Sequence, residues 1–405
     1  MRNWQTSSTL RTAVTLALLA MASPALHAED AMKSTSSHFA YIGTYNPNGE
    51  GVYRVQVDPV SGALSARTLA SSQPNPAQLT VDAKGQTLYV ASEVADFNGT
   101  QHGGIIAYRI NPTDGSLTQL NQVDAQGAGP VYLFLTPNGR HLLVANYVSG
   151  TVAAFPVESD GKLGTASSVQ QQQGPAGAGK PEAAVEGSFA ISDHNGPHAH
   201  MIASDPSGKF VFSTDLGLDR IYQWRFDDAS GQLTPNDPPW IAASSAGAGP
   251  RHFVFHPDGK TLLLVNEEAS TLTSYRFDNQ KGTLKQLHVV SSLPADYKGT
   301  NFAAGLVLSE DGKNLYVANR LHNSIAQFSV GSGGELHSVA ETWTRGDYPR
   351  SLTLSPDGRY LYAMNQRSDN VTRFSVDKAS GKLSFVEGYM PVGSPSQMVF
   401  LPLAK

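Results

Sequence analysis

The sequence contains no cysteine among its 405 residues. Disulfide bonds, thiolate nucleophiles and cysteine-ligated metal ions are therefore excluded, and so is a haem group attached through a Cys-x-x-Cys-His motif. Charged residues make up only 16% of the chain, with 29 basic against 34 acidic side chains and a formal net charge of −5. Because nucleic-acid binding depends on an excess of Lys and Arg, this balance argues against nucleic acid as a partner.

Long apolar runs are also missing. The run Ala13–Ala22 is shorter than the roughly 20 residues that a transmembrane helix needs, and no later stretch approaches that length. Two arginines precede this run and the segment SPALHAED follows it, an order typical of a secretory signal peptide. We therefore expect residues 1–28 to be a signal peptide, with cleavage after Ala25 or Ala28, and the mature protein to be periplasmic without membrane attachment.

Internal repeats account for most of the chain. Six segments carry two apolar stretches around a polar turn that contains glycine, and the turns are spaced by about 50 residues, the size of one propeller blade. The six segments are LTVDAKGQTLYVASE, LFLTPNGRHLLVANY, IASDPSGKFVFSTDL, FVFHPDGKTLLLVNE, LVLSEDGKNLYVANR and LTLSPDGRYLYAMNQ. Two further apolar stretches separated by another turn follow each segment, so one repeat predicts four antiparallel strands.

The two ends of the chain supply a seventh repeat. FAYIGTYN and GVYRVQVD (residues 39–46 and 51–58) lack a preceding first strand, whereas SQMVFLPL (residues 396–403) is a first strand with nothing after it. Pairing these segments completes a blade and removes two exposed sheet edges. The sequence therefore predicts an all-β fold, a seven-bladed β-propeller with one blade closed by N- and C-terminal strands, which occupies residues 29–405 as a single domain.

One interval between repeats is longer than the others. It contains SSVQQQQGPAGAGKPEAAVEG (residues 167–187), a segment rich in Gln, Gly and Ala. Low-complexity composition of this kind offers few side chains for a packed core. We interpret the segment as an insertion loop rather than as part of a blade.

The propeller topology predicts where polar side chains gather. In each blade the residues before the first strand and after the second lie at the same rim of the central channel, so Arg251 and Glu267 should be neighbours. By the same rule we expect a substrate-binding rim formed by Tyr45, Asn146, His198, His200, Asp215, Asp219, Arg320, Arg350, Asn365 and Gln366. The Pro-Asp-Gly turns should lie at the opposite face, where they are structural turns.

The two histidines of PHAH allow three interpretations. His198 and His200 are two residues apart, so a strand directs both side chains to one face. They could act as a base and its supporting partner, or they could bind a metal ion together with His194. A structural histidine bonded to the backbone is the third interpretation.

The charged residues of the rim also leave alternatives. Arg251 and Arg320 suit bidentate binding of a carboxylate or phosphate, but they fit salt bridges at a rim as well. Glu267 and Glu268 are adjacent and point in opposite directions on an extended strand, so we expect Glu267 to face the channel and Glu268 to be solvated. A serine nucleophile is not expected, because no Gly-x-Ser-x-Gly motif sits on a strand-to-helix turn.

Several short motifs, taken in order, resemble one family. PHAH followed by DLGLDR, GPRH followed by VNE, then ANR, and YPR followed by NQ are similar to the motifs of the seven-bladed lactonase family. That family includes bacterial 6-phosphogluconolactonase of the propeller type and fungal carboxy-cis,cis-muconate cyclase. The resemblance covers nearly the whole mature chain. It implies a catalytic cluster of His200, Glu267, Arg251 and Arg320 that works without a cofactor or a metal ion.

The resemblance also implies a reaction, the hydrolysis of a small-molecule lactone. We expect His200 and Glu267 to move the protons, in either order of base and acid, and Arg251 and Arg320 to hold the substrate anion and the developing oxyanion. The family suggests a sugar lactone, and export of the chain favours an unphosphorylated aldonolactone. The alternatives are a non-catalytic propeller that binds a protein or glycan partner and a muconate-type lactonizing cyclase; a redox propeller lacks any cofactor motif.

Overall fold

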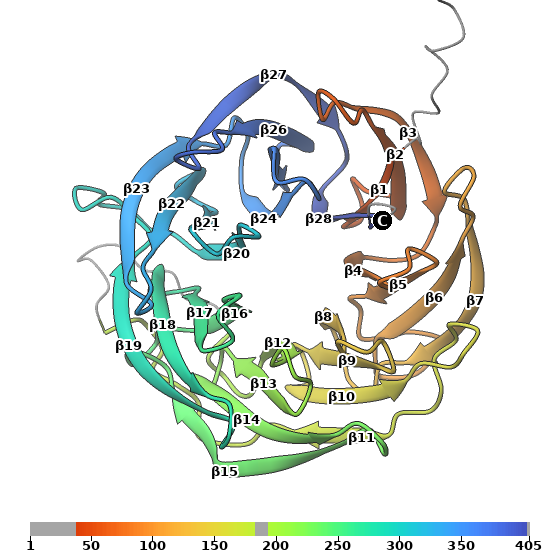
Figure 1. Ribbon diagram of the computed structural model, residues 1–405. Coiled ribbons are helices and arrows are strands. Elements are labelled where there is room, and N and C mark those ends of the chain that lie inside the picture. Colours follow the sequence, from red (N-terminus) through yellow and green to blue (C-terminus); the bar gives the residue numbers. More distant parts are fainter. Residues whose placement is uncertain (1–37, 183–192, 403–405) are drawn as a thin grey trace, which may run out of the picture. The chain divides into compact units, whose positions relative to one another are not determined.

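A computed structural model of the chain describes residues 38–182 and 193–402 (Figure 1). The expected signal peptide, residues 1–28, lies outside the described residues. The elements of the described part are strands joined by turns and loops. None of its segments is a helix with the length and apolarity of a membrane span.

The described strands form seven antiparallel sheets of four strands each, and these sheets are the blades of a ring (Figure 1). From the inside outwards, blade 1 contains β28 (Pro395–Phe400), β1 (His38–Thr44), β2 (Val52–Val57) and β3 (Leu64–Ser71); blade 2 contains β4 (Pro76–Val81), β5 (Thr87–Ser92), β6 (Gly104–Ile110) and β7 (Leu117–Asp124); blade 3 contains β8 (Pro130–Leu135), β9 (His141–Asn146), β10 (Thr151–Pro156) and β11 (Ser168–Gln171). Blade 4 contains β12 (Ala199–Ser204), β13 (Phe210–Asp215), β14 (Arg220–Asp227) and β15 (Gln232–Ala242); blade 5 contains β16 (Pro250–Phe255), β17 (Thr261–Asn266), β18 (Thr271–Asp278) and β19 (Thr283–Ser291). Blade 6 contains β20 (Ala303–Leu308), β21 (Asn314–Asn319), β22 (Ser324–Val330) and β23 (Leu336–Trp343); blade 7 contains β24 (Pro349–Leu354), β25 (Tyr360–Asn365), β26 (Asn370–Val376) and β27 (Leu383–Pro391). The predicted seven-bladed β-propeller is confirmed.

The two ends of the chain meet in blade 1. Strand β28 pairs antiparallel with β1, with Phe400 opposite Ala40 and Met398 opposite Ile42. The predicted closure by N- and C-terminal strands is therefore confirmed. The pairing covers the edge of β1, whose unpaired backbone groups would otherwise invite association with another chain.

The hydrophobic core lies between neighbouring blades. Along β17, Leu262 and Leu264 belong to a cluster shared with blade 4, whereas Leu263 and Val265 belong to a cluster shared with blade 6. Successive side chains of a strand point to opposite faces, and both faces of this strand are buried. A continuous apolar run such as TLLLVN is the expected sequence of such a strand, and its packing on both sides fixes each blade against the next.

Buried tyrosines tie neighbouring blades together through turn carbonyls. Their hydroxyl groups donate hydrogen bonds of 2.6 to 3.0 Å to glycine carbonyl oxygens. The pairs, donor first, are Tyr41 and Gly115, Tyr89 and Gly161, Tyr316 and Gly381, and Tyr362 and Gly62. A buried hydroxyl without a partner is costly, so these bonds favour one arrangement of adjacent blades.

The first residues of the expected insertion loop belong to blade 3, which corrects the prediction for this segment. The segment expected to be an insertion loop, residues 167–187, begins with a strand: β11 pairs with β10, Ser168 opposite Ala154 and Gln171 opposite Thr151. The outermost strand of a blade has little apolar surface to cover, and Gln170 completes it by donating a hydrogen bond of 3.0 Å to Leu233 O of blade 4. A polar composition therefore does not exclude a strand at this position, while residues 183–187 lie outside the described residues.

Candidate active site

The innermost strands all carry a β-bulge where they begin. In β16, Pro250 pairs with Asn266 and His252 pairs with Val265, which leaves Arg251 as the extra residue. A bulge bends the strand and re-aims the side chain of the extra residue. The bulge positions of the other blades are Ala77, Val131, His200, Ala304 with Gly305, Arg350 and Ser396.

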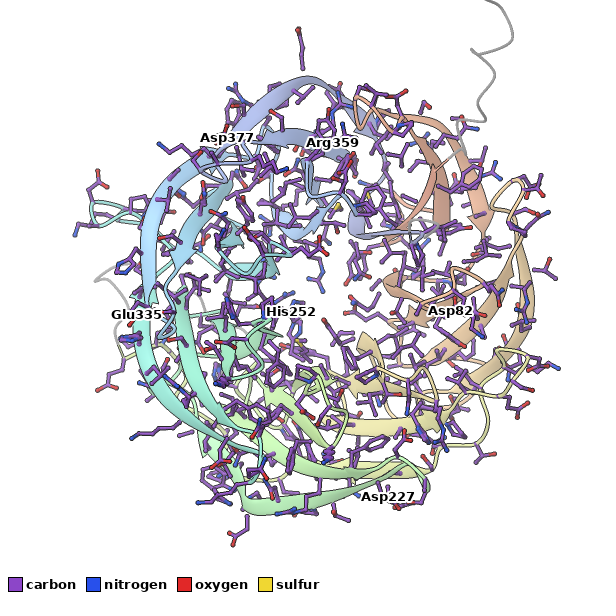
Figure 2. The ribbon with its side chains drawn as sticks, viewed as in Figure 1. Asp82, Asp227, His252, Glu335, Arg359 and Asp377 are labelled. Carbon is purple, nitrogen blue, oxygen red and sulfur yellow. The ribbon has the colours of Figure 1, made fainter. Side chains whose placement is uncertain are left out.

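These bulge positions surround a polar cavity. Its lining takes a bulge residue from every one of the seven blades, with His200, Arg251 and Arg350 as the charged or titratable ones among them. Tyr45, Tyr132 and His252 complete the aromatic part of the lining, and Figure 2 shows His252 beside the central opening of the ring. The predicted convergence of His200, Arg251 and Arg350 is thus borne out in space by one backbone feature repeated around the ring.

A second circle of residues follows the second strand of each blade. The residues directly after β1, β5, β9, β13, β17, β21 and β25, here called the rim positions, are Tyr45, Glu93, Tyr147, Leu216, Glu267, Arg320 and Gln366. Four of these were expected as site residues. Of the rim positions, Tyr45 lines the cavity directly, whereas the others are absent from its lining.

Glu267 is clamped between two arginines. Its Oε2 accepts a hydrogen bond of 2.6 Å from Nε of Arg251, and its Oε1 lies 2.6 Å from Nη2 of Arg320. All three side chains are buried. Burial by itself raises the pKa of Glu267, but the guanidinium groups of Arg320 and Arg251 outweigh it and lower the pKa below its usual value. Glu267 is therefore an ionised group that holds Arg251 in place, and both of its oxygens are occupied.

His200 lies in the cavity as a neutral imidazole. Its ring packs edge-on against His252, with the ring centroids 4.9 Å apart, and against Tyr147 at 5.4 Å. Burial, followed by the charge of Arg251, lowers the pKa of His200 well below its usual value. The Nδ1 atom is buried and has no hydrogen-bond partner among the described residues, so it is not the nitrogen that meets the cavity. A neutral imidazole that lines the cavity is suited to accept a proton through its other ring nitrogen, Nε2.

His252 is a site residue that the sequence did not single out. Nη1 of Arg251 lies 3.2 Å from its Nδ1, and its ring meets Tyr132 edge-on at a centroid distance of 5.0 Å. Burial and then the charge of Arg251 lower the pKa of His252 well below its usual value. The signal was present in the motif GPRH, because the residue that follows a bulge also borders the channel.

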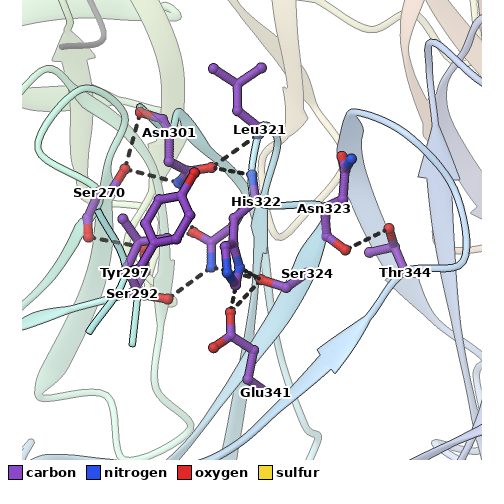
Figure 3. Close-up of polar contacts among 12 residues, drawn as sticks. Ser270, Ser292, Tyr297, Asn301, Leu321, His322, Asn323, Ser324, Glu341 and Thr344 are labelled. Atoms are coloured by element: carbon purple, nitrogen blue, oxygen red, sulfur yellow. Dashed lines mark hydrogen bonds and ion pairs between the residues drawn. The ribbon is translucent and has the colours of Figure 1, made fainter. Parts of the chain in front are cut away.

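The turn that carries Arg320 is fixed by polar contacts (Figure 3). Oδ1 of Asn301 accepts hydrogen bonds from the backbone N of Leu321 and of His322, at 3.1 and 3.2 Å. Nδ2 of Asn301 donates to Ser270 Oγ at 3.0 Å. These contacts link the β21–β22 turn to blade 5 and so position Arg320 beside Glu267.

The same turn holds a serine, a histidine and a glutamate in contact. Oγ of Ser324 lies 2.8 Å from Nδ1 of His322 and donates to Oε1 of Glu341 at 2.6 Å, while that carboxylate oxygen also lies 2.7 Å from Nδ1 (Figure 3). In a nucleophilic triad the serine and the carboxylate bond different ring nitrogens. Here both contact Nδ1, so the group stabilises the turn and does not activate Ser324.

A second carboxylate, Glu93, lies at the rim position of blade 2. Tyr45 donates a hydrogen bond of 2.5 Å to its Oε2, and Nη2 of Arg350 lies 3.9 Å from the same oxygen. The guanidinium of Arg350 also stacks over the ring of Tyr45 at 5.1 Å. Glu93 was not among the predicted site residues. It is nevertheless the last residue of TLYVASE, just as Glu267 is the last residue of the corresponding segment TLLLVNE.

Asn146 and Asn365 are structural, which corrects their expected role in substrate binding. Nδ2 of Asn146 donates to Thr151 Oγ1 at 3.0 Å, and Nδ2 of Asn365 donates to Asn370 Oδ1 at 2.9 Å. Asn266 and Asn319 make the corresponding bond five residues ahead in blades 5 and 6. The asparagine closes the second hairpin of these four blades, and the residue after it, such as Gln366, takes the rim position.

His198 and Asp215 are structural as well. The ring nitrogens of His198 contact Tyr147 O at 2.9 Å and Asn195 Oδ1 at 2.7 Å. Oδ1 of Asp215 accepts from the backbone N of His198 and of Leu218, both at 2.9 Å, and burial raises its pKa to about 7. The bulge places His200 in the cavity lining, whereas His198 and Asp215, which were expected to bind substrate, do not line this cavity.

Asp219 stabilises the loop that precedes Arg251. Its two carboxylate oxygens accept hydrogen bonds of 2.6 and 2.8 Å from the backbone N of Gly247 and of Gly249. These glycines belong to the loop that leads into β16 and Arg251. Asp219 therefore fixes the loop before Arg251 and does not line the cavity, contrary to its expected role in binding.

The three-histidine metal site is not formed. Both ring nitrogens of His198 are occupied, and His194 instead lies 3.8 Å from Asp219 Oδ1 and 3.9 Å from Glu268 Oε1. Across residues 38–182 and 193–402, no three His, Asp or Glu side chains are arranged to hold a metal ion. Glu268 is buried, so the expectation that it is solvated is wrong.

Comparison with known proteins places this geometry in a family. Residues 39–400 match the family model described as lactonase, 7-bladed beta-propeller. The chain belongs to the seven-bladed β-propeller lactonase family. It is therefore a lactonase by family, which agrees with the resemblance read from its short motifs.

Named relatives fall into two groups. A 6-phosphogluconolactonase of Bacillus subtilis is 32% identical over 90% of this chain and 99% of its own length, and one of Serratia proteamaculans is 30% identical over 75% of this chain and 82% of its own. The solved structure of a periplasmic gluconolactonase of Pseudomonas aeruginosa is similar with a TM-score of 0.81, at 30% identity, over 91% of this chain and 100% of that one.

Proposed function

We propose that the protein is an exported lactonase that hydrolyses an unphosphorylated aldonolactone in the central cavity. The observation that carries the proposal is the neutral imidazole of His200, which lines the cavity together with Arg251. A neutral imidazole is a base for water, and a guanidinium beside it stabilises the oxyanion that forms when water attacks a carbonyl.

Each residue has a distinct task in this proposal. The imidazole of His200 takes a proton from water, through Nε2, as the water oxygen attacks the lactone carbonyl. Arg251 donates to the carbonyl oxygen as it gains negative charge. Glu267 and Arg320 do not line the cavity; they hold the guanidinium of Arg251 in position through the two contacts of 2.6 Å. This assigns Glu267 a positioning role rather than proton transfer.

The proposed substrate carries no phosphate. The likeness to a periplasmic gluconolactonase and the signal-like order of the N-terminus support the same substrate outside the cytoplasm.

The test is turnover of D-glucono-δ-lactone and of its 6-phosphate, measured as acid release above the spontaneous rate. We expect the unphosphorylated lactone to be the better substrate, and His200→Ala to lower kcat/KM at least about 100-fold, the range of a general base. His337→Ala, an exposed histidine of β23, is the matched control and should leave the rate unchanged. Turnover at the spontaneous rate with both lactones, or an active His200→Ala variant, would contradict the proposal.

A further inference from the structure

The proposed function leaves the leaving oxygen without a proton donor. When the acyl C–O bond of an aldonolactone breaks, the departing sugar oxygen is a strongly basic alkoxide and needs a proton in the same step. Glu267 is unsuited to supply it, because both of its oxygens face guanidinium groups at 2.6 Å. The donor must therefore come from another part of the cavity wall.

The group formed by Tyr45, Glu93 and Arg350 lies in a suitable place. Tyr45 and Arg350 line the cavity together with His200 and Arg251, and they come from blades 1 and 7, whereas His200 and Arg251 come from blades 4 and 5. The phenol oxygen of Tyr45 lies 2.5 Å from Oε2 of Glu93. A proton can pass between these oxygens along a single hydrogen bond.

We propose that the Tyr45 hydroxyl is the catalytic acid that protonates the leaving oxygen, and that Glu93 supplies the replacement proton while Arg350 positions both groups. The inference rests on the proposed function, since it assigns the second proton of the same hydrolysis. It assigns Tyr45 a catalytic role in addition to its place in the cavity lining. It also gives Glu93 a role different from that of Glu267.

The protons and bonds balance as follows. Water loses one proton to Nε2 of His200 and forms the new bond to the carbonyl carbon. In its acid form Glu93 donates to the phenol oxygen, which leaves the Tyr45 O–H free to donate into the cavity. The tetrahedral intermediate then expels the ring oxygen, which takes this phenol proton while the carboxylic proton of Glu93 moves to the Tyr45 oxygen. Glu93 is left as a carboxylate and is reprotonated from solvent, to which its side chain is 22% exposed; His200 returns its proton to solvent.

The surroundings of both groups agree with this role. Burial raises the pKa of Glu93 above its usual value, although Arg350, the Tyr45 hydrogen bond and Arg251 all oppose the shift. Burial likewise raises the pKa of Tyr45, with Glu93 adding to the shift and Arg350 and Arg251 opposing it. Tyr45 therefore keeps its proton in the resting site, and the carboxylic acid form of Glu93 extends to higher pH than that of an exposed glutamate.

The pH dependence follows from these directions. The required acid form of Glu93 is lost as pH rises through its raised pKa, which gives the alkaline limb of the profile. The required neutral form of His200 is lost as pH falls through its lowered pKa, which gives the acid limb. A variant without the Glu93 carboxyl group should retain the acid limb and lose the alkaline one.

The experiment compares two lactones that differ in their leaving groups, in the full protein carrying Tyr45→Phe or Glu93→Gln. D-Glucono-δ-lactone expels an alkoxide, whereas dihydrocoumarin expels a phenolate whose conjugate acid has a pKa of about 10 and needs little help from an acid. We expect both variants to lose about 100-fold in kcat on the sugar lactone and less than about 5-fold on dihydrocoumarin. Glu387→Gln and Tyr389→Phe, two exposed residues of β27, are the controls and should change neither rate.

Several outcomes decide the matter. Equal losses on both lactones, or no loss on either, would overturn the assignment. If dihydrocoumarin is not turned over, the pH profile on the sugar lactone decides: an alkaline limb that persists in Glu93→Gln rejects the role of Glu93. A wild-type protein inactive on every aldonolactone rejects the proposed function itself, whereas an active wild type with unaffected Tyr45→Phe and Glu93→Gln variants rejects only this inference.

Discussion

Glu267 and Glu93 occupy the same position of two blades, directly after the second strand, yet their surroundings are opposite. Glu267 faces Arg251 from the bulge of its own blade and Arg320 from the rim position of the next, each at 2.6 Å. Glu93 has Ala77 at the bulge of its own blade, and its nearest cation, Arg350, is 3.9 Å away. The same blade position thus holds a carboxyl group whose pKa is lowered in blade 5 and one whose pKa is raised in blade 2.

The difference shows how a repeat protein obtains chemistry from a symmetric frame. The backbone of each blade repeats a bulge and a rim position, and the bulges of blades 2 and 5 have the same pattern of one extra residue. What varies is the pair of side chains at those positions. Two carboxylates whose pKa values are pushed apart in this way are the usual arrangement for separate catalytic roles.

The largest expected effect comes from breaking the clamp with Glu267→Gln. Two buried guanidinium groups would lose their counter-charge, so we expect a loss of roughly 3 kcal/mol in the free energy of unfolding and at least about 100-fold in kcat/KM. Urea denaturation and turnover of glucono-δ-lactone measure the two quantities. Because Glu267 acts as a fixed charge, its pKa lowered by Arg320 and Arg251 against the effect of burial, the residual activity should keep both limbs of the pH profile. Loss of the alkaline limb would mean that Glu267 transfers the proton.

A smaller effect is expected from making Glu93 resemble Glu267. Ala77→Arg places a guanidinium at the bulge of blade 2, where Ala77 lines the cavity. The added charge should lower the pKa of Glu93, and since the acid form is lost above that pKa, the alkaline limb should move to lower pH and activity at pH 7 should fall about 10-fold. The pH profile of kcat measures the shift. Ala77→Gln fills the same space without charge, and a similar shift in that variant would refute the electrostatic explanation.

The smallest effect on activity is expected at the asparagine positions. Asn365→Ala removes the hydrogen bonds from Nδ2 to Asn370 and Thr372, at 2.9 and 3.1 Å, and should cost about 1 to 3 kcal/mol of stability. Because the side chain does not reach the cavity, kcat/KM should stay within about 2-fold of wild type under conditions where the variant is folded. Thermal unfolding and turnover together test this. A large loss of kcat/KM in the folded variant would return Asn365 to the substrate site.

The fold was predictable because its signals are local and repeated. Each blade carries two apolar strands around a glycine turn, and the unmatched segments at the two ends identified the closing blade. The start of β11 was not, because Ser168 and Gln170 stabilise the outer strand through polar contacts that a hydrophobic pattern does not register.

The topology predicted which strand ends form the site, but not which of two neighbouring residues faces the cavity. His200, Arg251 and Arg350 were found because the topology brings the starts of the inner strands together. Asn146 and Asn365 were wrong because a bulge and a strand end decide whether a side chain faces the channel or the blade, and no composition rule sets that register. Glu93 and His252 were not predicted, although both belong to motifs of the repeats. Their positions match those of Glu267 and of the residue after a bulge only when the blades are aligned position by position.

The central claim is tested most directly by a crystal structure of the protein with gluconolactam, in which a ring N–H replaces the leaving oxygen and prevents hydrolysis. We expect the lactam to bind in the central cavity. Its carbonyl oxygen should point toward Arg251 on the side of His200, and its ring nitrogen should point toward the hydroxyl of Tyr45. A lactam bound outside the cavity, or bound with its ring nitrogen turned away from Tyr45 and its carbonyl away from Arg251, would contradict it.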